Sequence, residues 1–141
     1  MSQQFSTRSG SWSELKHYAM PIREHVFIQE QHINPEDEWD AQDEICTHFV
    51  VFDEDKQIAT ARLLSNHSIG RVAVLKAYRG LGIGHDLMKF IIEFAKQENR
   101  PNLILSAQVH AIPFYQNLGF EIQGDEYLDC GIPHINMFMS L

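Results

Sequence analysis

The feature that most constrains this chain is a glycine-rich segment, Arg79-Gly80-Leu81-Gly82-Ile83-Gly84, which we call the glycine loop. The apolar run before it, residues 72–75, is typical of a buried strand, and the apolar residues after it recur at helical spacing. Glycine has no Cβ, so its backbone can approach a bulky anion closely. A helix start also offers unpaired N–H groups and a partial positive charge. The loop is therefore predicted to bind the pyrophosphate of a nucleotide-like cofactor.

Two familiar phosphate-binding motifs do not fit the glycine loop. The dinucleotide fingerprint needs a glycine or alanine at position 85 or 87, where the chain has His85 and Leu87. The P-loop needs lysine and then serine or threonine after its last glycine, and His85-Asp86 cannot supply them. The remaining pattern is R-x-x-G-x-G, given by Arg79, Gly82 and Gly84. A glycine-rich turn that only starts a helix stays open as the alternative.

The composition argues against several classes of binding partner for such a site. The chain of 141 residues carries 19 acidic side chains against 11 Lys and Arg, a net charge of −8, so it lacks the basic surface that displaces counterions from nucleic acid. It has no apolar stretch of the roughly 20 residues that a membrane span needs, and no apolar signal core near its start. Neither Cys46 nor Cys130 nor His110 shows ligand spacing. We therefore expect one cytoplasmic domain, residues 1–141, with reduced thiols, no metal, and no nucleic-acid or membrane partner.

The pattern of apolar and turn residues predicts the order of the elements. A short N-terminal strand precedes Ser11-Trp12-Ser13-Glu14, which has the spacing of a capping box, and the helix after it should kink or restart at Pro21. Further strands are predicted at residues 48–52, 58–64, 69–75, 103–107, 120–122 and 134–138. Further helices are predicted from residue 82 to about 99 and over residues 111–118, the latter ended by Gly119. This order favours an α+β fold with one mixed sheet.

Four segments of the chain form a recognisable series. They are residues 72–84, which hold the glycine loop; the run Ala111-Ile112-Pro113-Phe114-Tyr115-Gln116-Asn117-Leu118-Gly119-Phe120; residues 23–31, with the pattern R-x-x-V-F-x-x-E-Q; and Gly131-Ile132-Pro133-His134-Ile135. The series, which spans positions 23 to 138, resembles the GNAT superfamily of acyl-CoA-dependent N-acetyltransferases. Within it, the chain is most similar to the small single-domain bacterial members of the ElaA and YjcF type.

The resemblance implies a GNAT fold of the α+β class: a central mixed, mostly antiparallel sheet with a splayed strand pair, flanked by helices. It implies acetyl-CoA as the acyl donor, with the pantetheine arm along the exposed edge of Val72, Ala73 and Val74 and the pyrophosphate on the N–H groups of residues 79–84. Where many relatives place an asparagine at the end of the next strand, this chain has Gln108. Glutamine keeps the amide for the cofactor arm but moves it one methylene further from the backbone.

Acyl transfer from a thioester to an amine sets three chemical requirements. The amine must be neutral, and because a lysine-like amine has a pKa of about 10.4, a base or a water relay is needed at pH 7. The tetrahedral oxyanion needs a donor, for which a backbone N–H near Val74 is expected. The departing thiolate benefits from a proton, and the resemblance implies Tyr115 as its source. A phenol with a pKa of about 10 keeps its proton at pH 7.

The base is not determined by the sequence. The candidates are Glu30, Asp40, Asp43, His48, Glu126 and His134. We prefer Glu30, at the end of the first helix, and Glu126, and we interpret His134 and His48 as core histidines. The acidic segment, residues 36–44, is read either as a solvated loop or as a surface that recruits a cationic acceptor.

The sequence thus predicts an N-acetyltransferase that moves the acetyl group from acetyl-CoA to a primary amine by direct attack in a ternary complex. Neither cysteine lies in a nucleophile motif, so no covalent enzyme intermediate is expected. The acceptor is a small molecule or a protein amine, and the protein is a monomer or a homodimer. The alternative from another class is a non-catalytic acyl-CoA-binding or sensing domain on the same fold.

Overall fold

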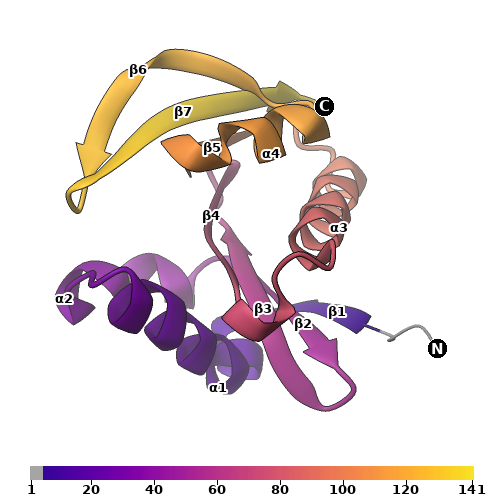
Figure 1. Ribbon diagram of the computed structural model, residues 1–141. Coiled ribbons are helices and arrows are strands. Elements are labelled where there is room, and N and C mark those ends of the chain that lie inside the picture. Colours follow the sequence, from indigo (N-terminus) through magenta and orange to yellow (C-terminus); the bar gives the residue numbers. More distant parts are fainter. Residues whose placement is uncertain (1–4) are drawn as a thin grey trace.

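The computed structural model describes residues 5–141, which form one mixed sheet covered on both faces by helices (Figure 1). The strands are β1 Phe5–Gly10, β2 Thr47–Asp53, β3 Lys56–Leu63, β4 Ser68–Val74, β5 Asn102–Gln108, β6 Glu121–Asp129 and β7 Ile132–Ser140. They lie in the order β1-β2-β3-β4-β5-β7-β6. Every neighbouring pair is antiparallel except β4 and β5, which are parallel.

The longer helices flank the sheet, and short helical turns connect them to it. The α-helices are α1 Trp12–Arg23, α2 Pro35–Glu38, α3 Ile83–Gln97 and α4 Ile112–Leu118. A π-helical segment, Glu24–Glu30, continues α1, and single 3-10 turns occupy Ala41–Glu44, Lys76–Tyr78 and Val109–Ala111. In the part of the chain from residue 5 onward, no helix is long and apolar enough to cross a membrane. The expectation about a signal core rests partly on residues 1–4, which lie outside the described range.

The start of α1 follows from its sequence, whereas its continuation does not. The Ser11 side chain accepts a hydrogen bond from the N–H of Glu14, and the Glu14 side chain accepts one from the N–H of Ser11, so the predicted capping box forms. The helix does not restart at Pro21, because α1 runs through Pro21 to Arg23. The helix then widens: the N–H of Gln31 donates to the carbonyl of Val26, five residues back, over 3.1 Å.

Alternate side chains of β2 divide the core between two layers. Val50 and Phe52 pack against Leu15 and Ala19 of α1 on one face. Phe49 and Val51 belong to the larger core on the other face, which includes the buried side of α3. This period-two division is what a strand buried on both faces requires, and it explains why β2 reads as an unbroken apolar run in the sequence.

The sheet splits between β4 and β5, and this splaying positions the site. The two strands pair only at Ser68 with Ile104 and at Ile69 with Leu105, after which they diverge. In Figure 1, β4 belongs to the lower half of the molecule with β1–β3, while β6 and β7 arch over the upper half with α4. The predicted α+β class and its splayed strand pair are confirmed.

A bulge in β4 faces the splayed region. Ala59 pairs with Val74 and Thr60 with Ala73, but the next ladder pair is Arg62 with Gly70, so two residues of β4 lie opposite one of β3. Arg71, in the bulge, has a φ of 53°, a left-handed conformation that is costly for a residue with a Cβ. The predicted C-terminal strands exist but are longer than expected, because β6 is exposed along its whole length and therefore shows no apolar pattern.

Candidate functional site

The glycine loop ends in unpaired backbone N–H groups at the start of α3, although the N–H of Arg79 itself donates to the carbonyl of Lys76 over 3.2 Å. Gly80 and Gly82 both have a φ of 81°, in the left-handed region that favours glycine. Gly82 is the N-cap and has no side-chain cap, and the first helical hydrogen bond runs from the N–H of Asp86 to the carbonyl of Gly82 over 3.0 Å. The N–H groups between them thus have no helical partner and can bind an anion.

A cavity of about 1060 Å³ runs along the splayed strands beside this loop. Every residue that the sequence predicts at the cofactor lines it, except Leu81, which points outward and is 54% exposed. A Cβ at Gly84 would lie 3.5 Å from the Phe114 ring and 3.7 Å from a methyl group of Val74. The absence of a side chain there keeps the passage between the loop and α4 open.

The edge of β4 forms one wall of the cavity. Ala73 and Val74 pair with β3 on one side only, because β5 has left the ladder after Ile69, and Val72 lies next to them in the bulge. Their backbone groups on the other side face the splayed region, where an extended amide-bearing chain can add to the strand edge.

Arg79 ties the loop to both β4 and the π-helical segment. Its Nε donates to the carbonyl of Val74 over 2.9 Å, and one terminal nitrogen lies 2.9 and 3.2 Å from the two carboxylate oxygens of Glu30. Glu30, predicted as a base, is therefore held in an ion pair beside the glycine loop, where it lines the cavity. The wider π-helical turns bring it there from the end of the first helix.

Tyr115 lines the cavity from α4. Its ring packs edge-on against Phe114 and Phe120, with ring centroids 5.0 and 6.0 Å apart. Burial alone raises the pKa of Tyr115 to about 12, because an apolar environment disfavours the phenolate. The hydroxyl therefore keeps its proton throughout the physiological range, as a proton donor must.

Gln108, the last residue of β5, makes two side-chain hydrogen bonds. Its amide nitrogen donates to the side-chain oxygen of Gln31 over 3.0 Å, and its oxygen accepts from Nε2 of His110 over 2.8 Å. The contact to Gln31 joins β5 to the residue that directly follows the π-helical segment. The longer side chain of glutamine reaches a protein partner here, and Gln108 still lines the cavity.

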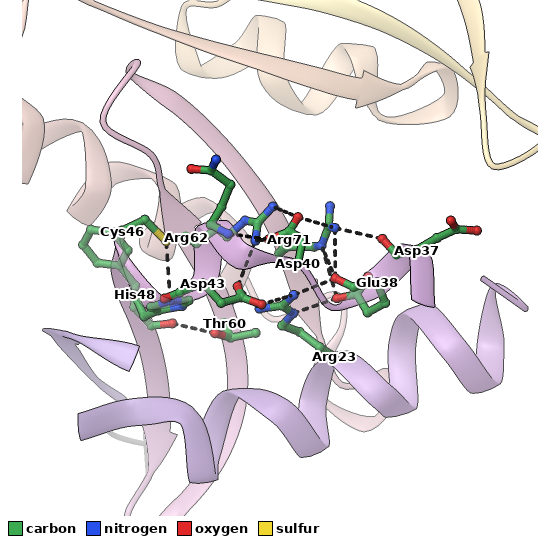
Figure 2. A network of polar contacts seen from close by, with 12 residues as sticks. Arg23, Asp37, Glu38, Asp40, Asp43, Cys46, His48, Thr60, Arg62 and Arg71 are labelled. Carbon is green, nitrogen blue, oxygen red and sulfur yellow. Dashed lines mark hydrogen bonds and ion pairs between the residues drawn. The ribbon is translucent and has the colours of Figure 1, made fainter. Parts of the chain in front are cut away.

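The acidic segment, residues 36–44, contains α2 and a 3-10 turn, and three of its six carboxylates pair with arginines (Figure 2). Arg23 binds Glu38 through Nε and Asp43 through a terminal nitrogen, both over 2.7 Å. Arg62 binds Asp40 over 2.7 Å and Asp43 over 2.8 Å. We call these five residues, with Arg71, the arginine–carboxylate network.

The network is neutral and mostly buried. Arg23, Glu38 and Asp43 are at most 3% exposed, and Arg71 reaches both Glu38 and Asp40 over 3.3 Å. The hydrogen bond from Arg62 lowers the pKa of Asp40 to about 2. Burial opposes ionisation of Asp43, yet its bonds to Arg23 and Arg62 hold its pKa below the ordinary value. Both readings of the acidic segment are thus wrong for Glu38, Asp40 and Asp43, which bind their own chain.

Comparison with known proteins decides the family. Residues 21–141 match the model of the acetyltransferase (GNAT) domain. The chain is 36% identical over 123 residues to a Bacillus subtilis (strain 168) protein named uncharacterized N-acetyltransferase YjcF, covering 84% of this chain and 88% of that protein. The chain belongs to the GNAT acetyltransferase family.

Solved structures agree with this assignment. Escherichia coli ElaA superposes with a TM-score of 0.85 at 30% identity, covering 96% of this GNAT chain and 99% of that one. An acyl-CoA N-acyltransferase from Pseudomonas aeruginosa superposes with a TM-score of 0.87 at 29% identity, covering 97% and 100% of the two chains. The resemblance to ElaA and YjcF is confirmed, and so is the fold that it implied.

The remaining candidate bases differ in whether they line the cavity of this GNAT domain. Glu126 lies on exposed β6 and does not line the cavity, and His48 is buried beside the network, with Nε2 2.8 Å from the carbonyl of Asp43. His134 lines the cavity from β7. Among residues 5–141 there is no group of three His, Cys, Asp or Glu side chains that could hold a metal ion.

Sequence reasoning overlooked two features of the site. Arg62 and Arg71 line the cavity and hold the acidic segment, although each is a single basic residue within a strand. The turn between β6 and β7 brings Asp129 and Cys130 to the same cavity, opposite Asp37 of α2. The left-handed φ of 50° at Cys130, followed by Gly131 at 77°, marks a tight hairpin turn. The Cys130-Gly131 pair was its only sequence signal.

Proposed function

We propose that this GNAT domain transfers an acetyl group from acetyl-CoA to a primary amine by direct attack in a ternary complex. The observation that carries the proposal is the continuity of the cavity from the glycine loop, past the open edge of β4, to Tyr115. One passage can thus hold an anion at one end and a reacting thioester at the other, with room for a second substrate beyond it.

The glycine loop fits the pyrophosphate of CoA. Its free N–H groups and the positive end of α3 would bind the anion. The pantetheine arm would then lie along Val72, Ala73 and Val74 and exchange hydrogen bonds with their backbone. Gln108 stands across the splayed region from this arm.

The chemistry follows from these positions. The amine lone pair attacks the thioester carbonyl carbon, a C–N bond forms, and the carbonyl electron pair moves to oxygen, where a backbone N–H near Val74 would stabilise it. The C–S bond then breaks with its electron pair on sulfur, which takes the proton of Tyr115. The second proton of the amine nitrogen, leaving as the amide forms, restores Tyr115. The high pKa of Tyr115 suits a group that starts and ends protonated.

A steady-state assay tests the proposal. Acetyl-CoA is mixed with the protein and with primary amines that differ in charge and size, and free thiol is followed together with the mass of the acetylated amine. Amine-dependent release of CoA with matching N-acetyl product supports transfer. Tight CoA binding by calorimetry without turnover on any amine would instead make the domain an acyl-CoA-binding module.

A further inference from the structure

The proposed reaction needs a group that removes a proton from the acceptor, because a primary alkylamine is mostly charged at pH 7. We propose that His134 is this base and that its Nε2 takes the proton of the acceptor ammonium. The proposal rests on the proposed function and assigns a role that the sequence did not favour.

The other candidates are unsuitable in the folded chain. Asp40 and Asp43 are bound by Arg62, and neither lines the cavity. Glu30 is paired with Arg79 of the glycine loop, so its carboxylate is already bound by a protein cation. His48 and Glu126 are absent from the cavity wall. His134 is thus the one member of the six that lines the cavity without an ion-pair partner among the described residues.

His134 lines the cavity from β7. In the sheet register it is opposite Gln108 of β5 and Tyr127 of β6. Its ring stacks on Tyr127, with centroids 6.1 Å apart and planes 25° from parallel. The Tyr127 hydroxyl donates to Asn136 over 2.7 Å and also contacts the Ser106 hydroxyl. These contacts fix the imidazole plane, as a positioned base requires.

One hydrogen bond decides which nitrogen can accept a proton. Nδ1 of His134 lies 2.7 Å from the carbonyl oxygen of Ile132. A carbonyl only accepts, so Nδ1 carries the hydrogen and the neutral ring has its lone pair on Nε2. Nε2 is on the edge of the ring away from Ile132 and makes no hydrogen bond to another residue in the described range 5–141. The arrangement, a pinned Nδ1–H and an open Nε2, is that of a general base.

The surroundings of His134 suit a cationic substrate. The same cavity is lined by Asp37 and Glu38 of α2, by Arg71 of β4, and by Asp129 and Cys130 at the β6–β7 turn. Glu38 and Arg71 neutralise each other in the network. The carboxylates of Asp37 and Asp129 remain for an incoming ammonium group, which then reaches His134 beyond them.

The proton balance is complete without another reactant. Nε2 of His134 removes one proton from R–NH3⁺, and the neutral amine attacks the thioester as described above. The imidazolium then returns its proton to solvent. The sum is one ammonium and one acetyl-CoA converted to one amide, one CoA thiol and one released proton.

The test compares two primary amines of similar size with different basicity. Benzylamine is mostly charged at pH 7, whereas aniline is already neutral and needs no base before attack. His134→Gln keeps a hydrogen-bonding side chain but removes the base. His17→Gln, on the exposed surface of α1 outside the cavity, is the matched control. Calorimetric titration with CoA verifies that each variant folds and binds the cofactor.

We expect His134→Gln to lower kcat/KM for benzylamine about 10²-fold, a usual loss for a general base, and to change the rate with aniline less than about threefold. The deficit with benzylamine should shrink as the pH rises toward the pKa of that amine. Equal losses with both amines, or no loss with benzylamine, would overturn the role of His134 while leaving the proposed function intact. A parent protein that acetylates neither amine nor any other would remove the proposed function itself.

Discussion

The glycine loop and the acidic segment both stand out in the sequence, yet the fold leaves backbone N–H groups of the first unpaired and pairs half of the carboxylates of the second. The loop, residues 79–84, keeps its backbone N–H groups at the helix start without helical partners, beside a cavity. In the acidic segment, residues 36–44, the carboxylates of Glu38, Asp40 and Asp43 form ion pairs with arginines of the same chain. The loop can therefore bind a ligand, whereas these three carboxylates hold α1, α2, β3 and β4 together.

The difference lies in what each motif uses. The loop works through backbone groups, whose geometry is set locally by glycine conformations. The acidic segment works through side-chain charges, which are neutralised by whichever residues the fold brings near. Its partners Arg23, Arg62 and Arg71 come from another helix and two strands. A charge run thus says little about function until its partners are known.

The largest expected effect is a loss of stability when an arginine of the arginine–carboxylate network is replaced. Arg23→Met leaves Glu38 and Asp43 buried with one cationic partner fewer, and removing one member of a buried ion pair costs about 3–5 kcal/mol. Urea unfolding should show a loss of this size. Glu36→Gln, on the exposed side of the same segment, is the control and should stay within about 0.5 kcal/mol of the parent. A loss below about 1 kcal/mol for Arg23→Met would mean that the network does not stabilise the fold.

The second-largest expected effect is a loss of activity when the Tyr115 hydroxyl, which lines the cavity beside the glycine loop, is removed. Tyr115→Phe keeps the ring contacts with Phe114 and Phe120 and removes the hydroxyl that we propose as the proton donor. We expect kcat to fall about 10²-fold, at the low end for a general acid because a thiolate leaves readily, with little change in CoA affinity. Tyr18→Phe, which packs on Phe52 at the opposite layer, should be silent. An unchanged kcat under conditions where chemistry limits turnover would make Tyr115 a packing residue.

A smaller effect is a dependence of stability on acidic pH. The pKa of Asp40 is about 2 in the folded chain against an ordinary 3.8, so its contribution is present above pH 3.8 and is lost as the pH falls through 2. The side chain is 37% exposed, and screening by solvent limits this contribution to less than about 1 kcal/mol. Asp40→Asn should therefore flatten the stability curve between pH 4 and 2. Curves of equal slope for the two proteins would show that Arg62 does not hold this carboxylate.

The smallest expected effect is on the KM for a cationic acceptor. Glu36 and Glu44 are exposed and do not line the cavity. If the acidic segment is structural, Glu36→Gln with Glu44→Gln should change the KM for benzylamine by less than about twofold at low ionic strength. A several-fold rise in KM that disappears on adding salt would restore the segment as a surface that recruits cations.

The parts of the molecule that the sequence predicted are those fixed by local rules. Ser11 and Glu14 form their capping box, and Gly80 and Gly82 adopt the left-handed turns that only glycine accepts easily. The starts of α1 and α3 follow for the same reason. Local patterns such as these do not depend on distant residues.

The parts that escaped prediction depend on distant contacts. Glu30 meets Arg79, 49 positions away, only because the helix changes to π-helical turns after Arg23. The tautomer of His134 depends on a carbonyl within its own strand, but its access to the cavity depends on the splaying of β4 and β5. No spacing in the sequence carries this information. The resemblance could name a family position for Tyr115 but not a base.

The central claim is that the backbone of the glycine loop binds the anionic part of a ligand. Gly84 gives the cleanest test, because its φ is not left-handed and a Cβ there meets only ordinary contacts. Gly84→Asn and Gly84→Asp add side chains of nearly equal size, and an aspartate in the first helical turn also favours α3.

The measurement is a calorimetric titration of CoA into the parent protein and both variants. Bringing like charges together costs several kcal/mol, so Gly84→Asp should bind CoA at least about 10²-fold more weakly than Gly84→Asn, and melting temperatures should show both variants folded. Equal CoA affinity in the two variants would contradict the account, because the pyrophosphate would then lie away from the loop.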